Sequence, residues 1–521
     1  MKLIPPQAVK THLSSNHELA FLDVREAGQY GESHPFFAIN VPYSQLERLV
    51  PTLVPNREVM VVLIDGADGV AERAAKRMTA MGYRDVGIVT GGIAGWEGAR
   101  YGLFKGVNVP SKTFGELVEH AFDTPRISAS DLARRVANGD DLVILDGRTA
   151  SEFSRMCIPG GVSCPNAELV ARWQRFAPSP DTTVVINCAG RTRSIMGAEN
   201  LRQLKIANPV VALENGTQGW QLAGFELDRD QPPVSLAPLS ESERSDAISR
   251  ARPLAQSLGI PLIDPDRLNA MREGPRTWYL LDVRTEEEFA QGHVSDARHA
   301  PGGQLVQSTD QWVAVRGAQI VLTDDVLLRA VISAHWLRGM GHDVAVLDGP
   351  AALYAETTAP AVAFPTATLT TIDAAQLPRA LQNGTRVLDA SPSMLFREAH
   401  LAPAQWINRA NALSISPTPS VIVTGPEPTV AALLAIDLIE LGVENIQFTP
   451  RDIPQWEAAG LDVIRNDGTL PDAECIDYLF FVHDRHSGNL DAARAYLAWE
   501  TGLIGQLDED ERGALNPHGT A

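Results

Sequence analysis

Cysteine is scarce in this sequence. The 521 residues include four cysteines, which are Cys157, Cys164, Cys188 and Cys475. They are too few and too unevenly spaced to form a framework of structural disulfides. We therefore expect any cysteine chemistry in this protein to be reactive rather than structural.

Long apolar runs and an excess of positive charge are also missing. No run approaches the roughly 18 to 20 apolar residues that cross a bilayer, and the N-terminus lacks the basic and apolar segments of a signal peptide. The net charge of -20 disfavours nucleic acid and anionic membranes, because both are polyanions. We expect a cytoplasmic protein with no nucleic-acid and no membrane partner, which binds small molecules or other proteins.

The composition is typical of a globular protein, and the length indicates several domains. Hydrophobic residues make up 44% of the chain and charged residues 21%, as in ordinary globular proteins. A chain of this length exceeds one compact core. Repeats therefore become the main guide to its organisation.

An apolar strand that ends in aspartate recurs four times, at intervals of roughly 110 to 135 residues, which is the size of a whole domain. An aromatic residue follows seven positions after each aspartate. The four segments are AFLDVREAGQY, VILDGRTASEF, YLLDVRTEEEF and RVLDASPSMLF.

Two further elements follow in each unit. The first is a buried strand, a short turn and an amphipathic helix; the second is a closing segment with Trp96, Trp220, Tyr354 or Trp456. Strands that alternate with helices and lack polar alternation indicate a parallel sheet covered on both faces. The sequence therefore predicts an α/β protein of four tandem domains, and the tryptophans are expected in their cores.

The expected boundaries follow from the repeats. The domains are placed at residues 1–110, 123–232, 256–356 and 370–467, with a C-terminal tail at 468–521. Segments 230–256 and 355–371 are rich in proline and small polar residues and are read as linkers. In the tail, Asn489 is expected to cap a helix from Leu490 to about Glu500, and the tail is expected to dock on a domain.

Cys188 ends the strand of the second unit, in VVINCAGRTRSIMGAENL. The shared frame places Asp65, Asp324 and Gly425 at the equivalent positions of the other units. Only the second unit can therefore form a covalent bond to sulfur at this position.

The surroundings of Cys188 favour a thiolate. A cysteine between a strand and a helix faces backbone N–H groups and the positive end of the helix dipole. Arg191 and Arg193 add charge of the same sign. We therefore expect a nucleophile of low pKa beside a pocket for an anion.

Gly190, Thr192 and Ser194 are expected to support the loop and the binding of an anion. Gly190 permits a backbone conformation that residues with a β-carbon resist. Thr192 and Ser194 can offer hydroxyl groups to a bound oxyanion.

The three repeated elements together resemble the rhodanese domain, and CAGRTR, Cys188 to Arg193, resembles its six-residue active-site loop. The resemblance extends to about residue 467, and the chain as a whole resembles bacterial sulfurtransferases with four such domains. It implies that Cys188 takes sulfane sulfur from a small anionic donor such as thiosulfate, forms a persulfide and passes the sulfur to cyanide or a thiol. The implied substrate-binding residues are Ala189, Gly190, Arg191, Thr192, Arg193 and Ser194. No metal and no organic cofactor is expected, because the persulfide is the only intermediate required.

Three units depart from this pattern and are expected to be inactive. Asp65 and Asp324 replace the cysteine in two of them, and we hypothesise that their carboxylates fill the N–H nest of the loop. The fourth unit has Gly425 in a loop with prolines, and its Asp-x-Arg element is eroded to Asp389 and Ser391.

Several other residues have structural interpretations. Asp146 and Arg148 recur in units that lack the cysteine, so a structural ion pair or helix cap is favoured over catalysis. Cys157 and Cys164 are interpreted as packed residues, with a role as resolving thiols as the alternative. His483, Asp484 and His486 are interpreted as a solvated cap rather than as a metal site or a lid over the active loop.

Two other functions compete with sulfur transfer to small acceptors. A scaffold could carry the persulfide to a protein partner, which would explain the extra units, and a homodimer is also kept open. A cysteine phosphatase or arsenate reductase needs arginine six positions after the cysteine, where this chain has Ser194. We expect a sulfurtransferase first and a persulfide carrier second.

Overall fold

The computed structural model describes residues 2–15, 17–232, 235–416, 418–466, 468–486 and 489–519, except for the side chain of His486. Contacts divide the chain into two compact units. The first comprises Met1–Leu13, Leu19–Gly106 and Val362–Phe480, and the second comprises Ser14–Glu18, Val107–Ala361 and Phe481–Ala521. None of the helices in the described residues has the length and apolar character needed to cross a membrane.

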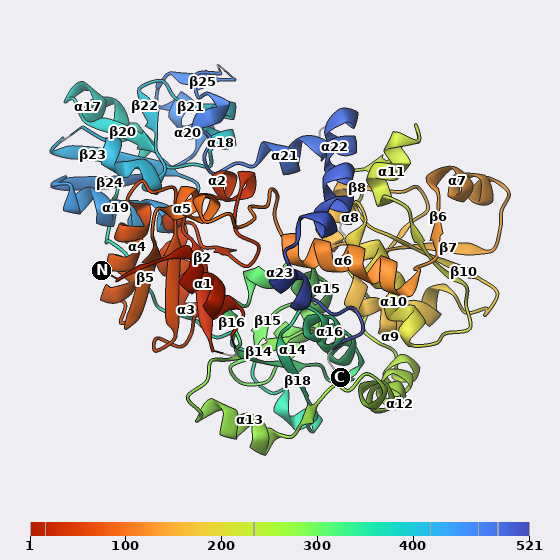
Figure 1. Cartoon of the computed structure of the whole chain (residues 1–521). Helices are drawn as coiled ribbons and strands as arrows, with labels where there is room; N and C mark the ends of the chain where they lie inside the picture. Colours follow the sequence, from red (N-terminus) through yellow and green to blue (C-terminus); the bar gives the residue numbers. More distant parts are fainter. Residues whose placement is uncertain are drawn as a thin grey trace. The chain divides into compact units, whose positions relative to one another are not determined.

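The first unit holds two parallel sheets (Figure 1). One has the order β1-β5-β4-β2-β3, with β1 (Lys2–Ile4), β5 (Asp85–Val89), β4 (Met60–Ile64), β2 (Leu19–Asp23) and β3 (Ile39–Asn40). The other has the order β19-β24-β23-β20-β22, with β19 (Thr370–Thr371), β24 (Asn445–Pro450), β23 (Ser420–Gly425), β20 (Arg386–Asp389) and β22 (Ala404–Trp406). A short antiparallel ribbon joins β21 (Ala399–Leu401) to β25 (Val463–Arg465).

The second unit also holds two parallel sheets. One has the order β6-β11-β10-β7-β9, with β6 (Arg126–Ile127), β11 (Val210–Leu213), β10 (Thr183–Asn187), β7 (Leu142–Asp146) and β9 (Val162–Ser163). The other has the order β13-β18-β17-β14-β15, with β13 (Leu262–Ile263), β18 (Asp343–Leu347), β17 (Gln319–Thr323), β14 (Trp278–Asp282) and β15 (Arg298–His299). Its remaining strands are β8 (Met156–Cys157), paired antiparallel with β12 (Asp228–Arg229), and β16 (Val315–Arg316).

The four sheets share one strand order. In each, the first and last strands of the repeat lie on one side of the fourth strand, and the second and third lie on the other. The predicted α/β architecture with parallel sheets is therefore confirmed. The order reverses between the fourth and second strands, and ligand sites of parallel sheets form at such a point, beyond the carboxyl ends of the strands.

Helices flank these sheets. Those of the first unit are α1 (Pro6–Leu13), α2 (Ala27–Glu32), α3 (Leu46–Leu53), α4 (Val70–Ala80), α5 (Gly92–Gly98), α17 (Leu377–Gln382), α18 (Ser393–Glu398), α19 (Pro428–Glu440) and α20 (Ile453–Ala458). Those of the second unit are α6 (Val109–Phe122), α7 (Ala129–Ala137), α8 (Ala150–Arg155), α9 (Asn166–Phe176), α10 (Thr192–Gln203), α11 (Gly216–Leu222), α12 (Glu241–Ser257), α13 (Pro265–Arg272), α14 (Glu286–Gln291), α15 (Gly302–Gln307), α16 (Leu328–Gly339), α22 (Leu490–Thr501) and α23 (Glu509–Gly513). Helix α21 (Phe480–His483) lies at the boundary.

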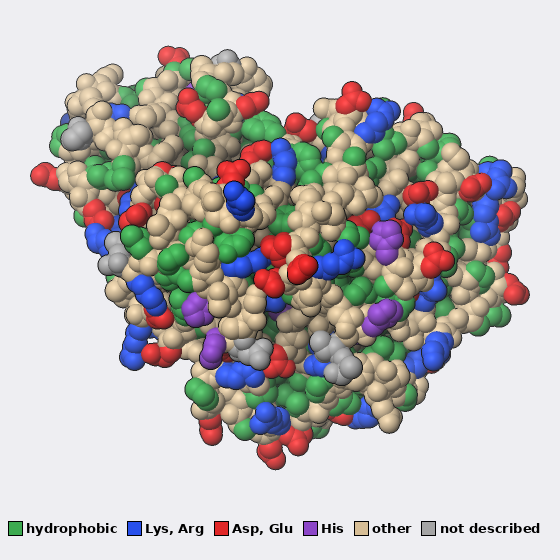
Figure 2. All heavy atoms as spheres, viewed as in Figure 1, with side chains coloured by type: hydrophobic (Ala, Val, Ile, Leu, Met, Phe, Trp, Pro, Cys, Tyr) green, Lys and Arg blue, Asp and Glu red, His purple; other side chains and the backbone are tan. Residues whose placement is uncertain are grey.

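Short 3-10 helices complete the structure. They are η1 (Tyr43–Gln45), η2 (Thr309–Gln311), η3 (Ala351–Leu353), η4 (Ala374–Gln376), η5 (Arg409–Ser414), η6 (Asp472–Glu474), η7 (Asp484–His486) and η8 (Leu503–Gln506). On the molecular face drawn in Figure 2, acidic and basic side chains are interspersed.

The sheet that carries Cys188 is packed on both faces. Ile144 and Val185 share a core cluster with Leu132 of α7 and Trp220 of α11. On the other face, α10 approaches so closely that a Cβ at Gly197 would lie 2.8 Å from the Ile186 side chain. Burial of both faces explains why these strands read as continuous apolar runs.

The structure corrects the interpretation of segment 230–256 as a linker. Its second half forms α12, because the Ser240 side chain caps the helix and Glu243 completes a capping box. The long helix α6, between the first two predicted domains, was not foreseen. In the tail, the predicted helix is confirmed as α22, capped by Asn489, and it packs against α6 and α11.

The Asp-x-Arg element forms a buried ion pair. Arg148 donates to the two Asp146 carboxylate oxygens at 2.8 and 2.7 Å and to the Met156 carbonyl at 2.7 Å. Equivalent pairs occur at Asp23–Arg25 and Asp282–Arg284.

In the sheet that contains β20, Arg451, which directly follows β24, takes over one contact of this arginine, the contact to a backbone carbonyl. Ser391 cannot pair with Asp389 as an arginine would, and Arg451 donates instead to the Ala399 carbonyl at 3.0 Å. This carbonyl lies eight residues after Ser391, as Met156 lies eight after Arg148.

Replacing one partner of the buried pair should destabilise the fold strongly. Arg148→Met leaves the Asp146 carboxylate, 1% exposed, without its cation, and we expect a loss of roughly 3–5 kcal/mol in the free energy of unfolding. Urea denaturation measures this loss. The matched control is Arg84→Met, which breaks an exposed ion pair with Glu58 and should cost at most about 1 kcal/mol. Equal losses in the two variants would contradict the assignment.

Candidate functional site

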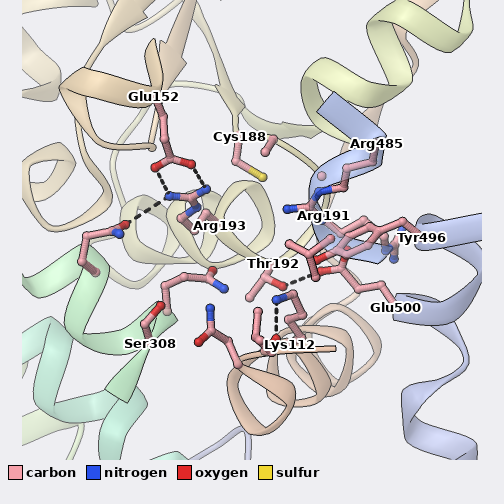
Figure 3. A pocket seen from close by; sticks show the side chains of 17 residues that line it. Lys112, Glu152, Cys188, Arg191, Thr192, Arg193, Ser308, Arg485, Tyr496 and Glu500 are labelled. Carbon is pink, nitrogen blue, oxygen red and sulfur yellow. Dashed lines mark hydrogen bonds and ion pairs between the residues drawn. The ribbon is translucent and has the colours of Figure 1, made fainter. Parts of the chain in front are cut away.

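Cys188 lies directly after β10, at the carboxyl edge of its sheet. The residue is 2% exposed, and its thiol donates to the Ser194 hydroxyl oxygen at 3.5 Å. It lines a cavity of about 210 Å³. In Figure 3 its sulfur lies between the side chains of Arg193 and Arg485.

Helix α11 holds the loop that follows Cys188. The backbone N–H groups of Thr217 and Gln218 donate to the carbonyls of Cys188 and Ala189 at 2.8 and 3.2 Å. Gly216 makes this approach possible, because it has a φ of +55° and a Cβ there would overlap the Cys188 carbonyl oxygen. The carbonyls are thereby turned toward α11, which leaves the loop N–H groups for the thiol side.

Burial dominates the protonation of the thiol. It raises the pKa of Cys188 above the ordinary value of 9.0, while Arg193, the Ser194 hydroxyl and the N–H groups of Gly190 and Ser194 lower it. The predicted stabilising groups are present, but the prediction of a low pKa is wrong for this structure. The free-energy cost of removing the thiolate from water exceeds the stabilisation that these groups give it.

Arg191 is paired with two carboxylates of α6. Its guanidinium donates to the two Glu116 oxygens at 2.6 and 2.8 Å and also to Glu119. This side chain is 8% exposed. Its charge is therefore balanced before any donor binds.

Arg193 is paired with Glu152 of α8. Its two terminal nitrogens each donate to a Glu152 oxygen at 2.7 Å, and one also donates to the Gln304 side chain at 3.1 Å. Burial raises the pKa of Glu152, but Arg193 overrides it and holds the value at about 2. This pair stays ionised beside Cys188, and the roles of both arginines toward a donor remain predictions.

The other predicted loop residues have different contacts from those expected. The Thr192 hydroxyl donates to Glu500 at 2.7 Å, and the Ser194 hydroxyl donates to the Arg191 carbonyl at 2.8 Å, behind Cys188. Both hydroxyl groups therefore donate to acceptors within the protein. Gly190 does not have a positive φ, so the expected glycine-only conformation is absent there.

Three segments outside the second predicted domain complete the cavity. Helix α6 contributes Lys112, and the tail contributes Arg485 and Glu500. Gln304 of α15 and Ser308, directly after α15, come from the third predicted domain. No sequence pattern assigned these residues to the site, although the tail was expected to dock on a domain.

Lys112 is a buried cation of this cavity. It is 5% exposed, donates to the Val107 carbonyl at 2.6 Å and lies 5.9 and 5.7 Å from the rings of Tyr496 and Trp499. Burial lowers its pKa to about 7, although the Glu500 charge raises it. The amine therefore gains or loses its proton near neutrality.

The hypothesis on the two substituted loops is confirmed. Asp65 accepts from the backbone N–H groups of Ala67 and Ala71, both at 2.9 Å. Asp324 accepts from the N–H groups of Val326 and Arg329 at 3.2 and 2.8 Å. Both carboxylates therefore occupy the N–H groups of their own loops.

The remaining candidates do not join the site. Cys157 and Cys164 are buried, and burial raises the pKa of both thiols; neither lines the cavity as the structure describes it. Of the histidine pair in the tail, the His486 side chain lies outside the described residues.

Known proteins match this chain along most of its length. Residues 5–99, 128–223 and 264–354, more than half of the chain, match the rhodanese-like domain. The chain is 38% identical to a thiosulfate sulfurtransferase from Pseudomonas aeruginosa, whose crystal structure matches with a TM-score of 0.89 over 99% of both chains. It is also 29% identical over 92 residues to the putative sulfur carrier protein YrkF of Bacillus subtilis. That match spans 18% of this chain and 49%, about half, of the curated relative.

The pH dependence of alkylation should reveal the raised pKa of Cys188. We expect the rate of iodoacetamide labelling to keep rising with pH beyond 9.0 instead of levelling off near neutrality. Arg193→Gln should slow labelling further, because Arg193 lowers this pKa. Peptide mass spectrometry measures both rates, with buried Cys164 as the internal control. A plateau near neutral pH would contradict the expectation.

Proposed function

Because the chain belongs to the family of rhodanese-like domains, we propose that it transfers sulfane sulfur from thiosulfate or a similar anion to a small acceptor through a persulfide on Cys188. It is an enzyme of the thiosulfate sulfurtransferase type. The observation that carries this proposal is the position of Cys188, a single cysteine at the wall of a cavity that is also lined by the cations Lys112, Arg191, Arg193 and Arg485.

The chemistry proceeds in two halves. The Cys188 thiolate attacks the outer sulfur of thiosulfate, the S–S bond of the donor breaks, and sulfite leaves with the bonding electrons. The acceptor then attacks the outer sulfur of the persulfide, and Cys188 leaves as a thiolate. The loop N–H groups and Arg193 support the negative charge on sulfur in both halves.

We place catalysis in the second of four domains, at residues 123–232. The domains at 1–110 and 256–356 contain Asp65 and Asp324 in place of the cysteine. The segment 370–467 is proposed as a degenerate fourth domain, supported by its shared strand order and by Arg451, which donates to the carbonyl that the missing arginine would reach.

The alternative functions receive less support. A carrier that hands sulfur to a protein needs an accessible persulfide, whereas Cys188 is 2% exposed; this burial favours small acceptors. A phosphatase needs an arginine where Ser194 stands, and the Ser194 hydroxyl contacts Cys188 and the Arg191 carbonyl.

Removing the nucleophile should abolish turnover. We expect Cys188→Ser to form no thiocyanate from thiosulfate and cyanide above background, while Cys164→Ser retains activity because Cys164 lies outside the cavity. Steady-state kinetics with both substrates varied should give the parallel lines of a ping-pong reaction for the wild type. Residual thiocyanate formation by Cys188→Ser would refute the persulfide route.

Lys112 should make donor binding depend on pH. Its pKa of about 7 means that the ammonium is present below this value and lost above it, so the KM for thiosulfate should rise as pH increases through about 7. Lys112→Met should raise the KM at lower pH roughly tenfold, the value of one charge-assisted hydrogen bond, and remove this pH dependence. The exposed Lys76→Met is the control. An unchanged KM profile in Lys112→Met would exclude the role.

A further inference from the structure

Glu500 is a buried acid that lines the cavity beside the loop of Cys188. It lies on α22 and is 2% exposed. One carboxylate oxygen, Oε1, accepts from the Thr192 hydroxyl at 2.7 Å. The other, Oε2, has no hydrogen-bond partner among the residues that the structure describes.

The unpartnered oxygen is directed at the loop. A Cβ built on Gly190 would lie 3.4 Å from Oε2, and Glu500 lines the same cavity as Cys188 (Figure 3). Its electrostatic neighbours are Lys112, Glu116, Arg191 and Tyr496. The arrangement leaves one acceptor site available to a bound molecule.

This position is difficult to explain by stability or by donor binding. A buried oxygen without a hydrogen bond costs roughly 1–3 kcal/mol, and a carboxylate repels an anionic donor. A proton donor that enters the cavity would satisfy the oxygen. Of the proposed acceptors, a thiol brings such a proton, and it must lose that proton to become nucleophilic.

We propose that Glu500 is the general base for a thiol acceptor, so that the tail of the chain selects small protonated thiols in the second half-reaction. The inference rests on the proposed persulfide at Cys188 and assigns the acceptor class of that same site. Thr192 holds Oε1 and so leaves Oε2 for the thiol.

The step is balanced in atoms and electrons. The S–H bond of the acceptor breaks and its proton moves to Oε2. The resulting thiolate attacks the outer sulfur of the persulfide, a new S–S bond forms on the acceptor, and the Cys188–sulfur bond breaks with its electron pair on Cys188. The proton on Glu500 returns to the Cys188 thiolate, so no external oxidant or reductant is needed.

The test uses the full chain, first loaded to the persulfide and quantified by intact mass. Glu500→Gln keeps the size of the side chain but removes the base. At a pH about one unit below an ordinary thiol pKa of roughly 8.5, about a tenth of a small thiol such as 2-mercaptoethanol is already thiolate. Transfer to this thiol should therefore slow by up to roughly tenfold. Transfer to sulfite, which carries no proton at mildly alkaline pH, should change by no more than about threefold.

The pH profile separates catalysis from a structural role. The deficit of Glu500→Gln toward the thiol should shrink as pH rises above the thiol pKa, because the acceptor is then already a thiolate. Glu500→Asp should recover part of the rate. Asp491→Asn, an exposed substitution on the same helix, should match the wild type with both acceptors.

Two results would overturn the inference. Equal slowing toward thiol and sulfite would assign Glu500 a structural role, and an unchanged thiol rate would exclude it as the base. Failure of the wild type to load sulfur is a separate outcome that contradicts the persulfide itself. The loading step therefore distinguishes failure of the function from failure of the acceptor assignment.

Discussion

The burial of Cys188 is the constraint on which the site depends. At 2% exposure, the thiolate loses most of its hydration, and the protein must replace it with oriented N–H groups and cations. Those cations are buried in turn, and Arg191 and Arg193 therefore each require carboxylates. The loop is thus fixed by a balanced set of charges, and the burial that raises the pKa of the thiol would also shield the proposed persulfide from water.

The same constraint gives a role to segments that carry no nucleophile. Glu116 and Lys112 come from α6, Gln304 comes from α15, and Glu500 comes from the tail. The second predicted domain alone would leave the cavity without these walls. The two aspartate loops show the opposite solution, because each supplies its own carboxylate to the N–H groups that would otherwise receive an anion.

The sequence was sufficient to predict features that repeat or that are local. The strand pattern predicted the parallel sheets, the shared frame located Cys188 and the aspartates, and Asn489 marked the start of the tail helix. It was insufficient for contacts between distant segments. Arg191 meets Glu116 across 75 positions and Thr192 meets Glu500 across 308, and no local pattern records such pairs. The low pKa was predicted from the loop N–H groups, the helix dipole and the two arginine charges, because burial cannot be read from one loop.

The most direct test of this account is the intact mass of the protein before and after incubation with thiosulfate, followed by addition of cyanide. The account predicts a gain of one sulfur atom, localised to the peptide with Cys188, that disappears when cyanide is added and never forms in Cys188→Ser. A sulfur atom found on another cysteine, or no gain while thiocyanate is still produced, would contradict it.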